Sequence, residues 1–341
     1  MKINFYERDS RKNDLDFEQT AGSFSIICHI IRDELKKLDY YTENPEEADF
    51  VGIADSLSLN WQYPEKKTFI IAFLDNINTI SHLQYEFYYR CKPILFSINQ
   101  HTADLYKKYG IDCQVIGPGI KEKFWYQTKS KNEIFTFFHN GYSNYRSGIE
   151  ILIDAFKKAF EDNKKVQLII KNTSDNKILE QIIKDCGSNV KYLNSRITHN
   201  EMRDLYSQSH VFCSIFRMSG HGIGIAEAGL CNCLVLTGDF NPSNKINQHG
   251  ILLKPEKEIN IYDYMETAKQ RGLSDTFGQL FYFEQPRFYD YNISEYSELL
   301  QNIYLHWENK YSKINSREKI LEVWNTQKSA ENLIRYLNEK F

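Results

Sequence analysis

A glycine-rich stretch, SGHGIGIAEAGLCNCLVL from Ser219 to Leu236, is the part of the sequence best suited to hold an anion. It follows the apolar run HVFCSIF, and a helix is predicted to begin near Gly222–Ile223. Backbone N–H groups at the start of a helix attract anions, and glycines let a phosphate approach without a Cβ in the way. Glu227 lies about one turn further in, where a carboxylate can accept hydrogen bonds from two vicinal hydroxyls. A phosphate beside a diol describes a nucleotide or a nucleotide sugar.

Two familiar phosphate motifs do not fit this stretch. The dinucleotide fingerprint requires a third glycine where Glu227 stands, and no ribose-binding acid is obvious ~20 residues further on. A P-loop requires a Gly-Lys-Ser/Thr sequence, which does not follow. From these residues alone, the alternative interpretation is a tight glycine turn followed by a solvated glutamate.

The composition excludes some classes of protein. The chain has 42 Lys and Arg against 45 Asp and Glu, a net charge of -3, so the protein as a whole is not expected to attract nucleic acid. Its 23 Tyr and 22 Phe predict an aromatic core, or an aromatic surface that contacts a sugar or a base. The seven cysteines lack regular spacing and are interpreted as reduced. Because the start of the chain is unlike a signal peptide and no apolar run approaches ~20 residues, a cytoplasmic protein without a transmembrane segment is expected.

Short apolar runs alternate with amphipathic helices along the chain, a rhythm typical of open, mainly parallel α/β sheets. The length of 341 residues suits two such domains, which a turn-rich stretch near 118–132 separates. Thr198 and Glu201 form a predicted capping box at the start of one helix. The predicted strands are residues 2–6, 48–54, 67–74, 92–98, 112–117, 134–141, 166–172, 189–193, 210–216 and 233–238. The predicted helices include residues 24–38, 101–110, 149–160 and 198–209, and the tail 316–341 is also helical.

From Phe135 to Leu236 the sequence resembles the nucleotide-binding domain of the family-four glycosyltransferases. The signature of that family is a Glu, seven residues and a second Glu, with GFG after the first and EA at the second. The flanking segments RSGIEILIDAF, NVKYLNSRITHNEMRDLY and FSINQHTADLYKKYGIDCQVIGPGIKEKFW also resemble the family, in the right order. The resemblance covers about residues 95–260. Over the first 95 residues, only the alternation of predicted strands and helices is similar. The residues that match the signature are Gly220, Gly222, Ile223, Glu227 and Ala228.

This resemblance implies the GT-B fold, an α/β protein with two doubly wound Rossmann-like domains facing across a cleft. The first domain, on the acceptor side, would comprise residues 1–120 and, through a closing helix near Trp324, about 322–341. Residues 121–131 would be a linker. Residues 132–321 would form the nucleotide-sugar-binding domain.

The resemblance also assigns roles in donor binding. Glu227 would hold the ribose hydroxyls, and the Gly222–Ile223 backbone would meet the diphosphate. Arg146 lies at a helix start near the family's basic diphosphate contact, where a guanidinium matches phosphate oxygens and offsets charge on the leaving group. An exposed loop arginine is the alternative. Ser219 stands where the family has its first Glu, so that sugar recognition is altered or moved to His221.

Three further candidates lie in the second half of the chain. Lys171 stands at the carboxyl end of a predicted strand, where open α/β sheets bind ligands, although the family often has glycine there. Arg196 and Ile197 occupy the turn whose backbone cradles the base in relatives, and a plain turn is the alternative. The stretch Phe277–Tyr296 does not match the family, and its aromatic residues are interpreted as packing rather than as stacking on sugars or bases.

The first half offers candidates for the sugar and the acceptor. Gly22 and Ser23 resemble the family's glycine loop that closes over the donor phosphates, with an ordinary helix cap as the alternative. Asp75 ends a predicted strand at a carboxyl edge and is the candidate group for orienting the acceptor. Arg146 and Asp75 are therefore the candidate catalytic residues.

The implied function is transfer of a sugar from a nucleotide-diphosphate sugar, with UDP-glucose as the first guess, to an acceptor hydroxyl. In the family this proceeds with retention of configuration, with no cofactor besides the donor and usually no metal, and no convincing Asp-x-Asp motif is present. The acceptor stays open among a glycan, a lipid-linked sugar, a protein side chain and a modified nucleobase. Three alternatives remain. One is a sugar-nucleotide epimerase of the same fold, and another is an inactive nucleotide-sugar-binding relative, which the serine at position 219 in place of an acid would explain. The third is a nicotinamide-linked oxidoreductase, which the missing third glycine disfavours.

Overall fold

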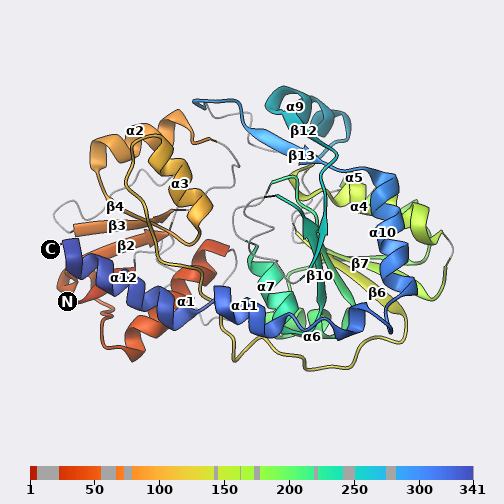
Figure 1. Cartoon of the computed structure of the whole chain (residues 1–341), viewed down its shortest axis with the longest axis horizontal. Coiled ribbons are helices and arrows are strands. Elements are labelled where there is room, and N and C mark those ends of the chain that lie inside the picture. Colours follow the sequence, from red (N-terminus) through yellow and green to blue (C-terminus); the bar gives the residue numbers. More distant parts are fainter. Residues whose placement is uncertain are drawn as a thin grey trace. The chain divides into compact units, whose positions relative to one another are not determined.

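The computed structural model describes residues 1–5, 23–54, 67–72, 79–141, 145–161, 163–172, 177–218, 222–240, 250–273 and 282–340. The chain forms two compact units. Unit 1 comprises residues 1–121, 280–284 and 321–341, and unit 2 comprises residues 122–279 and 285–320. Each unit is built on an open parallel sheet with helices packed against it (Figure 1). The predicted α/β class with two Rossmann-like domains is thereby confirmed.

Unit 1 has a five-stranded parallel sheet in the order β1-β2-β3-β4-β5. Its strands are β1 (Ile3–Phe5), β2 (Phe50–Ala54), β3 (Lys67–Ala72), β4 (Ile94–Ser97) and β5 (Gln114–Val115). Its helices include α1 (Ser23–Lys37), α2 (His82–Cys91), α3 (Gln100–Lys108) and α12 (Thr326–Lys340).

Helices cover both faces of this sheet. Successive side chains of a strand point to opposite faces, so each strand contributes to two layers of the core. Ile70 and Ala72 of β3 join a core with Tyr88 of α2 and Leu105 of α3, whereas Phe96 of β4 contacts Tyr336 of α12. In Figure 1, α2 and α3 lie on one side of this sheet, and α12 lies on the other side next to α1.

Unit 2 has a six-stranded parallel sheet in the order β11-β10-β9-β6-β7-β8. Its strands are β6 (Phe135–Asn140), β7 (Val166–Asn172), β8 (Val190–Asn194), β9 (Val211–Ser214), β10 (Leu234–Gly238) and β11 (Ile251–Leu253). Its helices include α4 (Ile149–Phe160), α5 (Lys177–Lys184), α6 (His199–Gln208), α7 (Ile223–Leu230), α9 (Ile261–Gln270) and α10 (Ile293–Leu305), and α11 (Arg317–Val323) begins in this unit. The antiparallel pair of strands β12 (Lys257–Asn260) and β13 (Arg287–Asp290), between which α9 lies in the sequence, adds a second, small sheet.

Adjacent aromatic residues of β6 show how the central sheet of unit 2 is covered on both faces. The Phe137 ring contacts Phe156 and Phe160 of α4, with centroids 6.0 and 5.6 Å away. The next residue, Phe138, points to the other face and contacts Tyr206 of α6 at 5.5 Å. Helix α4 also packs against α10, and α6 against α7.

The strand order of unit 2 creates a topological switch point between β6 and β9. From β6 the chain winds outward through β7 to β8, then returns to the other side of β6 and winds outward through β9, β10 and β11. The chain therefore leaves β6 and β9 in opposite directions at the carboxyl ends of these strands. Open α/β sheets bind their ligands at such a point. None of the helices in the described part of the chain has the length and hydropathy that crossing a bilayer requires.

Candidate donor site

The loop after β9 leads into α7 through a left-handed glycine. Gly222 is the residue at the N-cap position of α7, with φ 64° and ψ 29°, and within the described residues no side chain caps this helix start. A side chain at this φ is strained, so glycine suits the position. The amide groups of the first turn point out of the helix at its positive end, as an anion-binding site requires. The helix start predicted near Gly222–Ile223 is confirmed.

Glu227 lies one turn inside α7 and is buried, with 6% of its surface exposed. The hydroxyl of Tyr206 on α6 donates to its Oε2 at 3.4 Å, and Asn140 at the end of β6 also hydrogen-bonds that hydroxyl. Burial raises the pKa of the Glu227 carboxyl to about 8, and the hydrogen bond from Tyr206 opposes this only in part. The alternative of a solvated glutamate is therefore wrong. A buried acid that accepts one hydrogen bond at this distance from the described residues gains from any ligand that supplies more donors.

The loop after β6 brings Arg146 to the same edge of the sheet. Arg146 lies in the short 3-10 helix η4 (Tyr145–Ser147), just before α4, and is half-buried. Gly148 begins α4 with φ 66°, and a Cβ at this position would come within 2.6 Å of the carbonyl oxygen of Ile215, just beyond β9. The close approach fixes the start of α4 against the chain that leaves β9. Arg146 and the start of α7 thus border the switch point.

Lys171 lies on β7, in direct register with Asn140 of β6, and is 6% exposed. Burial lowers the pKa of its ammonium group. An ammonium group in this setting is stabilised most by an anion that shares its low-dielectric surroundings. Arg196 and Ile197 follow the edge strand β8, with Arg196 exposed and Ile197 half-buried. The structure therefore brings the described candidates of unit 2 to the carboxyl ends of its strands, and among them Arg196 and Ile197 lie furthest from the switch point.

Several predicted site residues are not placed by the structure. Gly22, Asp75, Ser219 and His221 lie outside the described residues. Ser23 is the first residue of α1. Their predicted roles stay predictions. Among the described residues, no three His, Cys, Asp or Glu side chains gather as metal ligands would.

Tyr206 and Arg217 are site residues that the sequence did not indicate. Tyr206 occupies a position on α6 that looks like ordinary core, and its hydroxyl meets Glu227 only because α6 packs on α7. Arg217 looks like a loop arginine before the glycines, yet it is 2% exposed and has two carboxylate partners, Glu150 and Asp290. Neither contact follows from periodicity or from a motif.

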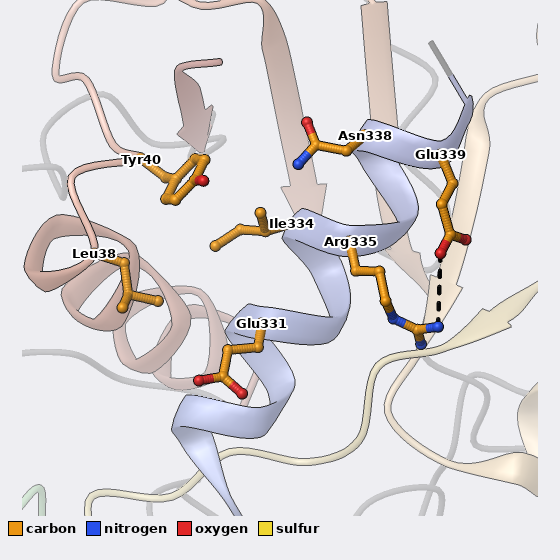
Figure 2. Close-up of a pocket in the computed structure, with 7 residues that line it drawn as sticks. All are labelled: Leu38, Tyr40, Glu331, Ile334, Arg335, Asn338 and Glu339. Carbon is orange, nitrogen blue, oxygen red and sulfur yellow. Dashed lines mark ion pairs between the residues drawn. The ribbon is translucent and has the colours of Figure 1, made fainter.

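A hollow of about 520 Å³ lies elsewhere, in unit 1 (Figure 2). It is lined by α12 and by the segment after α1, and two of its lining residues on α12, Arg335 and Glu339, form an ion pair with the charged atoms 3.7 Å apart. Tyr40 in this hollow accepts a hydrogen bond from the first residue of β1, Ile3, so the hollow lies toward the amino end of that strand. Ligands of open α/β sheets bind at the opposite edge. None of the predicted site residues that the structure describes lines this hollow.

Comparison with known proteins points to the region of unit 2 that contains the candidate site. Residues 133–268 match the family described as Glycosyl transferases group 1. Among solved structures, HepE of Anabaena in complex with UDP and glucose has a TM-score of 0.67 at 13% identity, over 99% of this chain and 100% of that one. AviGT4, a glycosyltransferase involved in avilamycin A biosynthesis, has a TM-score of 0.63 at 11% identity, over 98% and 96% of the two chains. No match was found among curated proteins.

The pneumococcal O-GlcNAc transferase GtfA, solved with UDP and GlcNAc, has a TM-score of 0.62 at 14% identity. The match covers 94% of this chain but only 60% of GtfA, so the chain spans less than two thirds of that enzyme. At such identities the structural likeness establishes the fold, which is that of the GT-B glycosyltransferases. The predicted resemblance is confirmed for residues 133–268, which lie in unit 2 and match Glycosyl transferases group 1.

Proposed function

We propose that the chain moves a sugar from a nucleotide-diphosphate sugar to an acceptor hydroxyl. The observation that supports this most is the start of α7 at the switch point of unit 2. There the left-handed Gly222 leaves the first-turn amides uncapped by any described side chain, and the buried acid Glu227 lies one turn further in. Both residues fall within the region that matches Glycosyl transferases group 1. UDP-glucose is the first donor to test, because HepE was solved with UDP and glucose.

The diphosphate of the donor would lie against the amides of Gly222 and Ile223. These groups carry the positive end of the helix dipole and need no reorganisation when an anion arrives. The guanidinium of Arg146, from the neighbouring loop, would neutralise charge on the diphosphate as it leaves. Lys171 would provide a second cation at the end of β7, where burial already lowers its pKa and an anionic ligand would raise it again.

The ribose of the donor would bind Glu227. Its carboxyl is held neutral at pH 7 by burial, which raises the pKa to about 8. Two vicinal hydroxyls donating to the carboxylate would favour the ionised form and lower that pKa. Donor binding would therefore release a proton from Glu227 at neutral pH.

The reaction would proceed with retention of configuration and without a metal or a further cofactor. The acceptor oxygen forms its bond to the anomeric carbon on the face from which the diphosphate leaves. The departing diphosphate oxygen takes the acceptor proton, so no strong protein base is needed. Asp75 would orient the acceptor, and Gly22 and Ser23 would cover the donor phosphates. Arg196 and Ile197 would border the base.

A nucleotide-sugar-binding protein without transferase activity is the second candidate. Ser219 stands where the family signature has an acid, and a hydroxyl there supplies one hydrogen bond without charge. Sugar recognition would then fall to His221 or be lost. An epimerase of the same fold would change the sugar of the nucleotide without any acceptor, so product analysis separates it from both other functions.

The test is a hydrolysis screen over nucleotide sugars without an acceptor, with native protein and the Glu227→Ala variant. Glu298→Ala, which changes an exposed glutamate on α10, serves as the matched control. One donor should be hydrolysed by the native chain and by the control, and not by Glu227→Ala. Equal rates in all three proteins would refute the role of Glu227. Binding of a donor without turnover under any acceptor condition would favour the inactive binding protein.

A further inference from the structure

A fully buried arginine connects three segments of unit 2 at the switch point. Arg217 is 2% exposed, and its Nη2 lies 2.6 Å from Oε1 of Glu150 and 3.1 Å from Oδ1 of Asp290. Its Nη1 donates to the carbonyl oxygen of Tyr145 at 2.6 Å, and its guanidinium lies over the Tyr145 ring, 3.7 Å from the centroid. One side chain thus holds η4, the first turn of α4 and the end of β13 together.

Stability alone does not account for a charged cluster at this place. Taking an arginine and a glutamate out of water is expensive, and well-packed apolar residues of similar volume are often as stable or more so. Glu150 is 3% exposed, and burial raises the pKa of its carboxyl while Arg217 acts in the opposite direction. Three apolar residues could not replace the N–H donors of the guanidinium, which connect a backbone carbonyl with two carboxylates.

Backbone hydrogen bonds extend the same connection. The amide of Arg217 donates to the carbonyl of Arg146 at 2.9 Å, and the amide of Tyr289 on β13 donates to the carbonyl of Arg217 at 2.9 Å. The hydroxyl of Tyr291 donates to the carbonyl of Phe216 at 3.1 Å. Two aromatic residues of the stretch that departs from the family pattern, Tyr289 and Tyr291, therefore pack against the chain that follows β9.

We propose that Arg217 is the positioning residue for the donor diphosphate. It fixes η4, which carries Arg146, relative to the segment that directly follows β9. A diphosphate that contacts both segments binds well only when their spacing is held before it arrives, because ordering them on binding would lower the affinity. Through Asp290, the β12–β13 strand pair is also held by Arg217. The inference rests on the proposed function and adds to it a residue that touches no substrate.

The test uses the full chain and three variants. In the first, Glu150→Leu, Arg217→Met and Asp290→Asn replace the cluster with residues that need no charge partner. The second is Arg217→Lys, which keeps a cation for Glu150 but cannot span the carbonyl and both carboxylates. The control combines Arg287→Met with Glu258→Leu. It removes an exposed ion pair from the same two strands, β12 and β13, in which the charged groups lie 3.0 Å apart. Calorimetry measures the Kd of UDP and GDP and of the nucleosides uridine and guanosine, and thermal melting checks folding.

The native chain and the control should bind one of the two diphosphates with the same Kd. In the triple variant that Kd should rise about tenfold or more, in Arg217→Lys by a smaller factor, and the Kd of the matching nucleoside should not change in either. A diphosphate Kd equal to the native value in a folded variant would overturn the inference, and so would a parallel loss of nucleoside affinity. If the triple variant does not fold, Arg217→Lys decides by the same criterion. If the native chain binds neither diphosphate, the proposed function fails, and the inference fails with it.

Discussion

Replacing Glu227 with glutamine should make the free protein more stable while it impairs donor binding. The pKa of this carboxyl rises from its ordinary 4.5 to about 8 because burial disfavours its charge. Between these two pH values the unfolded chain carries an ionised glutamate and the folded chain a neutral one. Folding must therefore take up a proton, and stability falls as the pH rises. Glutamine has nearly the same shape, can still accept the hydrogen bond from Tyr206, and never ionises.

The size of the effect follows from the two pKa values. At about 1.4 kcal/mol per pH unit, the difference between 4.5 and about 8 amounts to about 5 kcal/mol, reached at pH 8 and above. At pH 5.5, one unit above the ordinary value, the penalty is only about 1.4 kcal/mol. Glu227→Gln removes this pH-dependent part. The stability difference between variant and native protein should therefore grow by about 3 to 4 kcal/mol from pH 5.5 to pH 8.5.

Urea unfolding at the two pH values measures this difference, with Glu298→Gln on the exposed face of α10 as the control. The control should follow the native protein at both pH values, because its glutamate is solvated in both states. The same Glu227→Gln preparation should bind the donor about 10 to 100 times more weakly, because hydrogen bonds to a charged acceptor are worth about 1.5–3 kcal/mol. A stability difference that is the same at pH 5.5 and 8.5 would refute a neutral buried Glu227. Undiminished donor affinity would refute its contact with the ribose.

Two further predictions concern the same edge of unit 2. The affinity of the native chain for its donor should rise about tenfold from pH 6 to pH 7 and level off above about 8, since the ionised Glu227 binds the diol, and in Glu227→Gln calorimetry should find no such rise. Gly148→Ala should lower the free energy of unfolding by about 2 kcal/mol or more, since φ is 66° and the new Cβ would lie 2.6 Å from the Ile215 carbonyl oxygen. Gly187→Ala, with φ 84° and no atom of the described residues closer than 3.8 Å to the new Cβ, should lose only the part that comes from backbone strain. Equal urea midpoints for these two variants would contradict the reasoning.

Local patterns in the sequence predicted most of the fold. The predicted strand at residues 166–172 coincides with β7, and the predicted helix at 149–160 coincides with α4. The capping box is present, since the hydroxyl of Thr198 accepts from the amide of Glu201 and the Glu201 carboxylate accepts from the amide of Thr198. Such features depend on residues within one turn of each other. The strand pair β12–β13 was not predicted, because its short strands lack an apolar run and pair over a separation of about 30 residues.

Residues of the candidate site were predictable only where they belong to a short sequence motif. Gly222 and Glu227 stand in one short stretch whose spacing fits a helix start and an acid one turn inside it. The burial of Glu227 was not predictable, because the side chain that contacts it, Tyr206, belongs to another helix 21 residues earlier. Arg217 was harder still, since its carboxylate partners lie on α4 and β13 and only the completed sheet brings them together.

A crystal structure of the full chain with UDP would test the central claim most directly. The account predicts the two phosphates against the amides of Gly222 and Ile223, and both ribose hydroxyls hydrogen-bonded to the Glu227 carboxylate. Phosphates bound at another edge of the sheet, or a ribose that makes no contact with Glu227, would contradict it.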